Sequence, residues 1–187
     1  MHTLFWFAVL GCVYSYGLYP LLLRLLPVRR SAGPANTALP RVSLIIACRH
    51  EERRLRHKLE NALQLDYTDL EILVCSDASD DGSDAIVAGY AARGVRLVRS
   101  GERRGKEFAQ GLAIAAATGD VLVFSDAGTD LPAGSIRCLV EDLSDPAIGA
   151  VSSEDVFISA DGSVVGEGAY VKYEMWLRRL ESERAGL

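Results

Sequence analysis

The sequence predicts an α/β protein with a doubly wound, mainly parallel sheet, preceded by one N-terminal transmembrane helix. Two observations support this prediction. Between residues 42 and 143, short continuous apolar runs alternate with helix-forming segments, which is typical of parallel strands covered by helices on both faces. Residues 3–23 carry no charge, and an apolar helix of that length crosses a bilayer.

The composition is that of a globular protein. The chain has 187 residues, of which 49% are hydrophobic and 24% are charged. Arg24, Arg29 and Arg30 are the only charged residues in the first thirty, so the rest of the chain is more acidic than the net charge of −5 suggests. A nucleic-acid-binding protein needs a basic surface, and the sequence therefore predicts no nucleic-acid partner.

Four cysteines are spread along the chain without the spacing of a zinc site: Cys12, Cys48, Cys75 and Cys138. We expect them to be small buried side chains in a reducing compartment.

Residues 1–27 are expected to form the transmembrane helix. A cleaved signal peptide is the alternative, but it needs basic residues before the apolar run and a small-residue cleavage site after it. The first basic residue is Arg24, and Leu25-Leu26-Pro27 is a poor cleavage site. The arginines that follow the apolar run predict a single-pass protein of the cell (inner) membrane whose soluble domain faces the cytoplasm.

Residues 28–40 are expected to be a linker, because Gly33, Pro34 and Pro40 disfavour regular structure. The soluble domain is expected to begin at Arg41 and to extend to residue 187.

Strands and helices are predicted in alternation after Arg41. The predicted strands cover residues 42–48, 70–75, 95–98 and 121–125. The third is short and expected near an edge of the sheet, whereas the fourth is apolar enough to be a central strand covered on both faces. The predicted helices begin at residues 50–52, about 84, 106 and 132.

The pattern changes after residue 147. Residues 148–157 are predicted to form a strand, and residues 160–163 carry a hairpin-turn signal. A last helix is predicted over residues 170–184, with Tyr173, Trp176, Leu177 and Leu180 on one face.

Polar residues follow three of the predicted strands. They are Arg49 and His50 after the first, residues 77–81 after the second and residues 126–130 after the fourth. The carboxyl ends of parallel strands lie at one edge of a sheet, so these loops predict a ligand crevice. Asp126 in such a place is able to hold a divalent cation and, through it, a diphosphate. The alternative is that Asp, Gly and Thr form an ordinary turn there.

Two common nucleotide-binding motifs are missing. The first strand ends in Ala47-Cys48-Arg49-His50 without the glycines of a dinucleotide-binding G-x-G-x-x-G loop. The segment from Gly101 to Glu107 is one residue too short for a phosphate-binding P-loop and has Glu where the hydroxyl belongs. An NAD enzyme and a P-loop protein are therefore not indicated.

Four blocks resemble the inverting glycosyltransferases of family 2, which have the GT-A fold. Val42–Glu52 resembles the opening strand of that family, and Ser76–Ser83 resembles its nucleotide loop. Gly105–Asp120 resembles its Gly-Lys … Ala-Thr-Gly segment, and Phe124–Thr129 resembles its Asp-x-Asp block. The resemblance covers residues 42 to about 184, and four blocks in the right order and spacing are specific.

The resemblance implies a nucleotide-diphosphate sugar donor, most often a uridine one. It implies that Asp77 contacts the base and that Ala47, by its backbone, and Arg49 line the same pocket. Asp126 would face the ribose, the metal or the diphosphate. Lys106 lies in the basic segment of the family, where the choice is between a contact near the donor and a solvated lysine at a helix start.

Other polar residues near these blocks favour structural interpretations. Asp80 and Asp81 are expected to be turn and helix-cap residues. Arg103 and Arg104 are expected to lie in a solvated loop, with a contact to the diphosphate as the alternative.

Two departures from the family pattern matter. Gly128 stands where the second acid of Asp-x-Asp is usual, so a Mg²⁺ or Mn²⁺ ion would depend on Asp126 and the phosphates of the donor. Inverting transfer also needs a general base, which the family carries in a later block. Glu154-Asp155 follows the Asp126 block too soon for that role, so we expect a C-terminally incomplete, donor-binding portion of a longer enzyme.

The expected function is transfer of a sugar from a nucleotide-diphosphate sugar to a glycan or lipid-linked acceptor, with inversion, and mainly donor binding by these 187 residues. The alternative is a non-catalytic, membrane-tethered subunit that binds a nucleotide sugar and pairs with a partner chain supplying the acceptor half. A nucleotidyltransferase is a third interpretation, which the lack of a Gly-rich loop after the first strand disfavours.

Overall fold

The computed structural model describes residues 2–28, 39–153, 156, 158–159 and 168–184. The chain divides into two compact units, of which one comprises residues 34–144 and the other residues 1–33 together with 145–187. The first unit contains the sheet, and the second contains two helical segments from the two ends of the chain.

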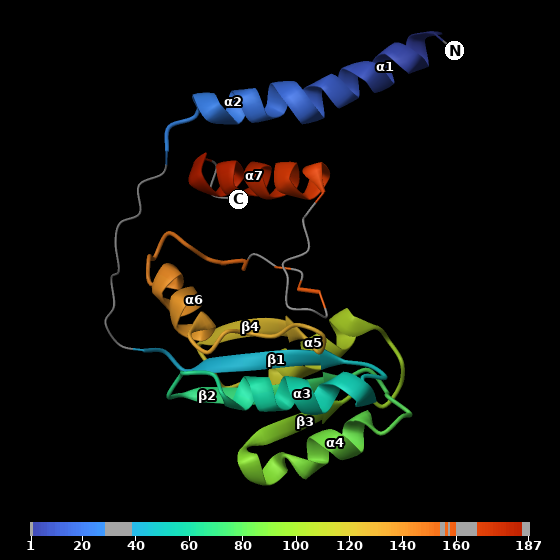
Figure 1. Cartoon of the computed structure of the whole chain (residues 1–187), viewed down its shortest axis with the longest axis vertical. Coiled ribbons are helices and arrows are strands. Elements are labelled where there is room, and N and C mark those ends of the chain that lie inside the picture. Colours follow the sequence, from blue (N-terminus) through green and yellow to red (C-terminus); the bar gives the residue numbers. More distant parts are fainter. Residues whose placement is uncertain (1, 29–38, 154–155, 157, 160–167, 185–187) are drawn as a thin grey trace. The chain divides into compact units, whose positions relative to one another are not determined.

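The sheet has four parallel strands in the order β3-β2-β1-β4 (Figure 1). They are β1 (Val42–Cys48), β2 (Leu70–Ser76), β3 (Val95–Arg99) and β4 (Val121–Asp126). The chain moves outward from β1 to β2 and β3, and then returns to place β4 on the free side of β1. The strand order therefore reverses between β1 and β4, as in other doubly wound sheets.

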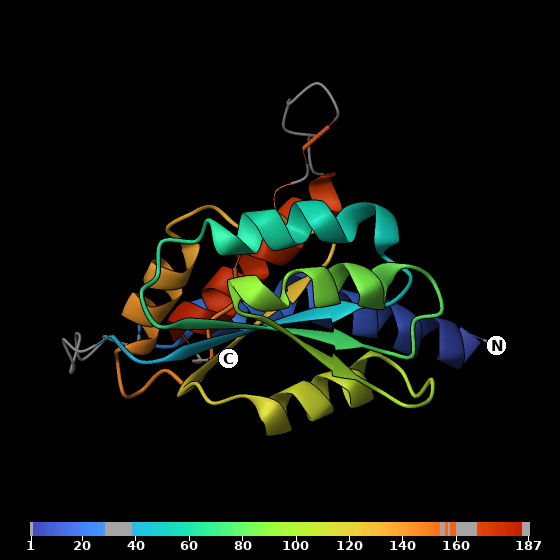
Figure 2. The ribbon, with the colours of Figure 1, turned by 90° about the horizontal axis from the view of Figure 1, so that it is seen from below.

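Helices cover both faces of this sheet, as the α/β alternation predicts. The helices of the first unit are α3 (Glu52–Leu63), α4 (Ser83–Gly89), α5 (Lys106–Ala116) and α6 (Ser135–Leu143). In Figure 2, α3 and α4 lie on one face and α5 lies on the other. The larger core cluster joins the sheet to α3, α4 and α6, and the smaller one joins it to α5.

Two predicted elements differ from the structure. Helix α6 begins at Ser135, three residues later than expected, because Pro132 and Ser135 form a turn in which the Ser135 N–H donates to the Pro132 carbonyl at 3.0 Å. The strand predicted over residues 148–157 is wrong in its described part, because residues 148–153 and 156 form no strand. An isolated bridge residue, Ile158, lies just beyond this range. An apolar run becomes a strand only where a neighbour supplies ladder hydrogen bonds, and the described part of the sheet has none for it. Residues 154–155 and 160–163 lie outside the described residues.

Strand β4 is also less covered than its sequence suggested. It is an edge strand of the described sheet, and the Phe124 side chain is 48% exposed. Cys48 and Cys75 are buried as expected, but Cys12 and Cys138 are exposed, so the prediction that all four cysteines are buried is wrong.

A buried polar cluster closes the amino ends of the strands. Glu71 on β2 accepts hydrogen bonds from the Ser43 hydroxyl (2.5 Å) and from the N–H (2.5 Å) and hydroxyl (2.9 Å) of Thr118, and it pairs with Arg96 at 3.0 Å. Despite burial, which raises the pKa of a carboxyl group, these hydrogen bonds lower the pKa of Glu71 to about 2. Gly119 completes the cluster, because a Cβ atom there would lie 2.6 Å from the Ser43 nitrogen.

The second unit pairs the N-terminal helical segment with α7 (Ala169–Arg184). The segment consists of α1 (His2–Val13), a π-helical turn η1 (Tyr14–Leu18) and α2 (Tyr19–Leu25). Taken together, residues 2–25 are long and apolar enough to cross a membrane. This confirms an apolar N-terminal helix, and its insertion into a membrane stays a prediction.

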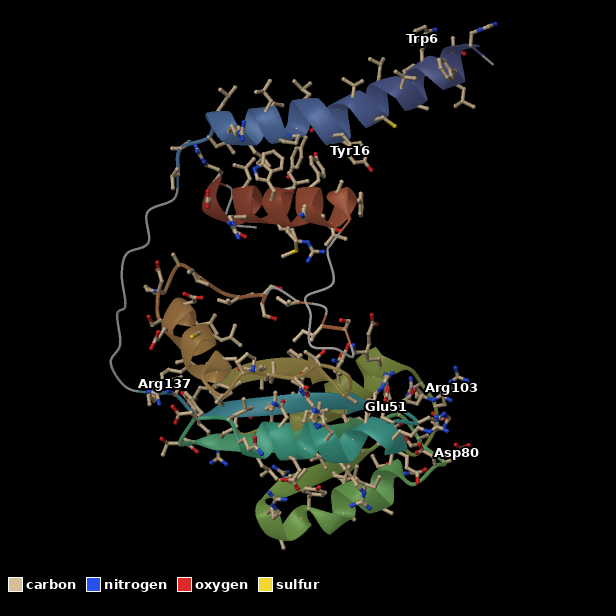
Figure 3. All side chains as sticks on the ribbon, in the orientation of Figure 1. Trp6, Tyr16, Glu51, Asp80, Arg103 and Arg137 are labelled. Carbon is tan, nitrogen blue, oxygen red and sulfur yellow. The ribbon has the colours of Figure 1, made fainter. Side chains whose placement is uncertain are left out.

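A hydrogen bond joins α7 to the π-helical turn of this segment. The Tyr173 hydroxyl of α7 donates to the Tyr16 carbonyl at 3.1 Å. Figure 3 labels Tyr16 on the N-terminal segment.

Candidate functional site

A cavity of about 580 Å³ lies at the carboxyl ends of β1, β2 and β4, where the sequence predicted a crevice. Its volume is in the range of small-molecule and cofactor sites. Figure 3 shows Glu51 and Arg103, two of the residues that line it, at this end of the sheet, whereas Arg137 lies at the opposite end.

The cavity contains every residue that the sequence singled out as a ligand contact. These are Ala47, Arg49, Asp77, Lys106 and Asp126. The strand register explains how two of them meet, because Ala47 on β1 pairs directly with Asp126 on β4. Strands β1 and β4 flank the point where the strand order reverses, which is where ligands bind in open α/β sheets.

The Asp77 carboxylate is tied to the loop that leads into α5. Its Oδ1 accepts hydrogen bonds from the N–H groups of Arg104 (2.9 Å) and Gly105 (3.1 Å), and the Gly105 N–H also lies 3.1 Å from Oδ2. Gly105 has φ of 96°, a left-handed conformation that favours glycine. Asp77 thus holds the Gly105–Lys106 segment over the cavity, and its carboxylate oxygens retain lone pairs for a ligand.

Lys106 and Asp126 line the cavity and contact each other directly. The Lys106 Nζ donates to Asp126 Oδ1 at 2.6 Å, and both side chains are more than half exposed. The lysine is therefore not simply solvated, because it has a partner. It is also free to exchange that partner for a ligand, because an exposed ion pair is weak.

Arg49 carries an unsatisfied donor. Its Nε atom is buried and has no hydrogen-bond partner. Buried donors without partners are costly in a protein interior, and they are rare in native structures. Arg49, together with Lys106, gives the cavity cationic groups suited to an anion.

The two loops that frame the cavity contain strained backbone. His50 after β1 and Ala78 after β2 have φ of 53° and 50°, although neither is glycine. The His50 N–H donates to Ser79 Oγ at 3.3 Å, and its imidazole Nε2 lies 2.6 Å from Asp80 Oδ1. Left-handed non-glycine residues cluster at functional sites, so their position here supports a ligand-binding role for these loops.

The carboxylates present fit a divalent cation only with help from a ligand. No group of three or more His, Cys, Asp or Glu side chains in the described part of the chain is arranged to hold a metal. Asp126 lines the cavity, whereas Asp130 does not and instead contacts His57 Nε2 at 2.9 Å. Mg²⁺ and Mn²⁺ are commonly bound by one or two carboxylates plus substrate phosphates, so Asp126 with a bound diphosphate is a sufficient donor set.

Gly128 leaves space where a second acid would project. A Cβ atom there would meet only the Arg54 Nη1 atom, at 3.6 Å, which is ordinary contact. Arg54 itself lines the cavity. A guanidinium therefore stands beside the position that a second carboxylate occupies in the family pattern.

The structural interpretations of the neighbouring residues are confirmed in part. Asp81 caps α4 and α3, because its carboxylate accepts from the N–H groups of Ser83 (3.1 Å) and Glu52 (3.3 Å). The Arg104 guanidinium stacks on the Phe108 ring at 4.0 Å. Arg103, in contrast, lines the cavity.

Sequence reasoning missed four residues of the site region: Glu51, Arg54, Cys75 and Lys58. Glu51 and Arg54 line the cavity at the start of α3, and only their place beside the first block signalled them. Cys75 lines it from β2, where burial raises the pKa of its thiol to about 11 and makes it a poor nucleophile. Lys58 lies fully buried behind the Asp126 loop, and nothing in the helical pattern distinguished it from a surface lysine.

Comparison with known proteins identifies the family of this chain. The family model described as glycosyl transferase family 2 matches residues 43–179. The chain belongs to glycosyl transferase family 2. The resemblance of the four sequence blocks is thereby confirmed, and so is the α/β, GT-A-type fold.

Two curated relatives of the family-2 chain are bacterial. The EpsE protein of Bacillus subtilis is 34% identical over 97 residues, which cover 49% of this chain and 34% of EpsE. The succinoglycan biosynthesis protein ExoO of Rhizobium meliloti is 29% identical over 131 residues, which cover 69% of this chain and 37% of ExoO. The chain thus spans about a third of the length of the curated relatives that it matches.

Solved structures show the same fold. A mannosyltransferase from Pyrobaculum calidifontis, solved in complex with GDP-Man and Mn²⁺, is 31% identical with a TM-score of 0.64 over 76% of this chain and 43% of that one. Glucosyl-3-phosphoglycerate synthase from Mycobacterium tuberculosis, solved with Mn²⁺, UDP and glucosyl-3-phosphoglycerate, is 22% identical with a TM-score of 0.51 over 65% of this chain and 50% of that one. The second likeness concerns the fold alone.

Proposed function

We propose that the cavity binds a nucleotide-diphosphate sugar and that the protein transfers the sugar, with inversion, to a glycan or lipid-linked acceptor. The observation that carries this proposal is the meeting of Ala47, Arg49, Asp77, Lys106 and Asp126 in one cavity at the switch point of the sheet. Family membership supports it independently.

Each residue has a role that its surroundings allow. Asp77 accepts a hydrogen bond from the base or ribose with the lone pairs that the Arg104 and Gly105 N–H groups leave free. Ala47 contributes backbone to the same pocket. The Arg49 Nε atom, which has no partner within the protein, donates to an oxygen of the donor. Lys106 exchanges its exposed ion pair with Asp126 for the diphosphate.

Asp126 would hold Mg²⁺ or Mn²⁺ together with the diphosphate oxygens. When bound, the ion would neutralise the negative charge that develops on the leaving nucleoside diphosphate. The mannosyltransferase structure with 31% identity was solved with Mn²⁺, which supports a divalent cation for this chain as well. The protein itself also supplies positive charge to the cavity. Its source is the Lys106 ammonium group, once it is released from Asp126, together with the guanidinium groups of Arg49, Arg54 and Arg103.

The nucleobase is proposed to be uracil or guanine. The sequence resemblance favours a uridine donor, whereas the structure with 31% identity was solved with GDP-Man. The general base that inverting transfer requires is assigned to none of the described residues. The acceptor classes follow from the family resemblance and from ExoO, which is described as a succinoglycan biosynthesis protein.

The proposed location is the cytoplasmic face of the cell membrane. The apolar helix at residues 2–25 would anchor the chain, with Arg24 at its cytoplasmic end. The proposed organisation is a transmembrane helix at residues 1–27, a linker at residues 28–40 and a family-2 domain at residues 41–187.

Titration of the detergent-solubilised chain with UDP, GDP and NAD, each with and without Mn²⁺, tests the donor assignment. We expect UDP or GDP to bind and NAD not to bind. Asp77→Ala should weaken binding in both the presence and the absence of metal, because the base contact does not depend on the ion. A folded chain that binds no nucleoside diphosphate would contradict the proposal.

A non-catalytic, membrane-tethered subunit is the second candidate. Gly128 favours it, because the second acid of the family block is replaced. Such a subunit would bind a nucleotide sugar and pair with a partner chain that supplies the acceptor half. Metal-independent UDP or GDP binding that survives Asp126→Ala and is lost in Asp77→Ala would favour this candidate over the enzyme.

A further inference from the structure

Lys58 is a fully buried lysine that the sugar-transfer proposal does not use. It lies on α3, and its side chain reaches the loop that follows β4. The Nζ atom donates to Ser125 Oγ at 2.8 Å and to the Thr129 carbonyl at 2.5 Å. A buried charged side chain needs a specific reason, because its desolvation is costly.

The two acceptors of Lys58 lie on either side of one turn. Ser125 comes directly before Asp126, and Thr129 closes the turn by donating its N–H to the Asp126 carbonyl at 3.2 Å. Asp126 and Gly128, which line the cavity, therefore lie between two points held by one ammonium group. An ammonium group has three N–H donors, so it is able to make both contacts at once.

Neighbouring residues of α3 hold the next part of the same loop. His57 contacts Asp130 at 2.9 Å, and the Asn61 side chain makes two hydrogen bonds of 2.9 Å with the backbone N–H and carbonyl of Leu131. One turn of α3 thus contacts loop residues 129, 130 and 131. Of these contacts, only the one from Lys58 spans the Asp126 turn.

The electrostatic environment supports a charged Lys58. Burial lowers the pKa of its ammonium group to about 8, while the nearby Asp130 and Asp126 carboxylates raise it. The ammonium form therefore predominates at neutral pH. It places a positive charge behind the loop, on the side away from the open cavity.

We propose that Lys58 is a positioning residue for Asp126, whose buried ammonium group fixes the Asp126–Thr129 turn so that the carboxylate faces the donor's diphosphate and its cation. This inference rests on the proposed function. It assigns Lys58 no contact with the donor, so the loss of Lys58 acts through Asp126 alone.

The test compares two affinities of each variant in the detergent-solubilised full chain. The first is the affinity for UDP and GDP without metal, and the second is the affinity for Mn²⁺ at saturating nucleotide, measured from the free Mn²⁺ signal in electron paramagnetic resonance. Lys58→Met keeps the length of the side chain and removes its donors. We expect about tenfold weaker Mn²⁺ binding, with nucleotide affinity in the absence of metal unchanged.

Two further variants make the result specific. Arg56→Met removes one positive charge from the exposed side of the same helix and should leave both affinities unchanged. Ser125→Ala removes one of the two Lys58 contacts with little effect on packing, and about threefold weaker Mn²⁺ binding is expected. It also provides the test if Lys58→Met fails to fold.

The possible outcomes separate the two proposals. Nucleotide binding by the wild type without any effect of Mn²⁺ would overturn the metal role of Asp126 itself. Mn²⁺-dependent binding that is equal in the wild type and Lys58→Met, or an equal loss of metal-free and Mn²⁺-dependent affinity, would overturn the positioning role of Lys58 alone.

Discussion

Polar clusters lie at both edges of the sheet, and they differ in how their groups are satisfied. At the amino edge, Glu71 is buried and receives hydrogen bonds from Ser43 and Thr118 as well as an ion pair from Arg96. At the carboxyl edge, the Asp126 and Lys106 side chains are exposed, and they form an ion pair with each other. The first cluster is complete within the protein, and the second is not.

This difference assigns different roles to two of the sequence blocks that resemble the family pattern. The Ala-Thr-Gly-Asp block contributes Thr118 and Gly119 to the closed amino edge, where they join β4 to β1 and β2. The Asp-x-Gly block contributes Asp126 and Gly128 to the cavity. We infer that the first block serves stability and the second serves binding, and the following variants test this division.

The largest effect is expected for Glu71→Gln. Its carboxyl pKa falls from 4.5 to about 2 on folding, so its contribution is fully present above pH 4.5 and is lost as the pH falls from 4.5 to 2. The shift corresponds to about 3 kcal/mol of unfolding free energy at pH 7. Denaturant unfolding at several pH values should show this loss of unfolding free energy in the variant. It should also show that the stability of the variant falls less steeply than that of the wild type between pH 4.5 and 2, while the folded variant binds nucleotide normally. If the stability of the variant falls as steeply as that of the wild type over this range, Glu71 does not stabilise the fold through its charge.

Asp126→Ala, in contrast to Glu71→Gln, should weaken nucleotide binding and leave stability almost unchanged. The side chain is exposed, so the free energy of unfolding should change by less than about 0.5 kcal/mol. The affinity for nucleotide in the presence of Mn²⁺ should fall by about 2 kcal/mol, or roughly thirtyfold, because a charged ligand of the ion is removed. Calorimetry with UDP and GDP measures this change, and Asp69→Ala, an exposed acid at the amino edge, is the matched control. Equal losses in both variants would show that the effect is one of net charge.

The two glycines provide a smaller, paired test of stability. A Cβ atom at Gly119 would lie 2.6 Å from both the Ser43 nitrogen and its Oγ, so Gly119→Ala should destabilise the protein by about 1–3 kcal/mol. Gly128→Ala places its Cβ at ordinary contact with Arg54 and should leave stability unchanged within about 0.5 kcal/mol. Thermal unfolding of the two variants side by side measures the contrast, and similar melting temperatures would contradict it.

Gly128→Asp is expected to give the mildest change, and it is a gain. A Cβ atom at Gly128 makes only ordinary contact, with Arg54, and a second acid would add a metal ligand. Arg54 lies close enough to pair with the new side chain and to limit the gain to a few fold. Mn²⁺ affinity at saturating nucleotide checks this, and a decrease would show that the new carboxylate points away from the ion.

Much of the fold was predictable because its strands are continuous apolar runs between clear turn signals. Strand bounds from Val42 to Cys48 follow directly from such a run. The position of β4 in the sheet was not predictable, since apolarity alone does not distinguish a central strand from an edge strand. Strand β4 is an edge strand of the described sheet, and its Phe124 side chain is exposed. The described part of the run at residues 148–157 is not a strand, because strand formation also needs a partner, which the local sequence does not contain.

The site was predictable to the extent that its residues end strands. Ala47, Asp77 and Asp126 were found because the ends of parallel strands meet at one edge. Contacts made through the backbone gave no signal, and the hydrogen bonds from Arg104 and Gly105 to Asp77 are an example. Lys58 was missed because burial of a lysine depends on tertiary neighbours such as Ser125 and Thr129, which are distant in sequence.

Paramagnetic broadening of backbone amide resonances by Mn²⁺ tests the division between the two edges most directly. The seven-residue strand β1 is about 23 Å long, and paramagnetic broadening falls steeply with distance, so an ion at one end broadens that end more strongly. With UDP or GDP present, the account predicts that substoichiometric Mn²⁺ broadens Ala47 and residues 126–129 more than Ser43, Glu71 and Thr118. Equal or greater broadening at the amino edge, or none at residues 126–129 in the nucleotide-bound chain, would contradict the account.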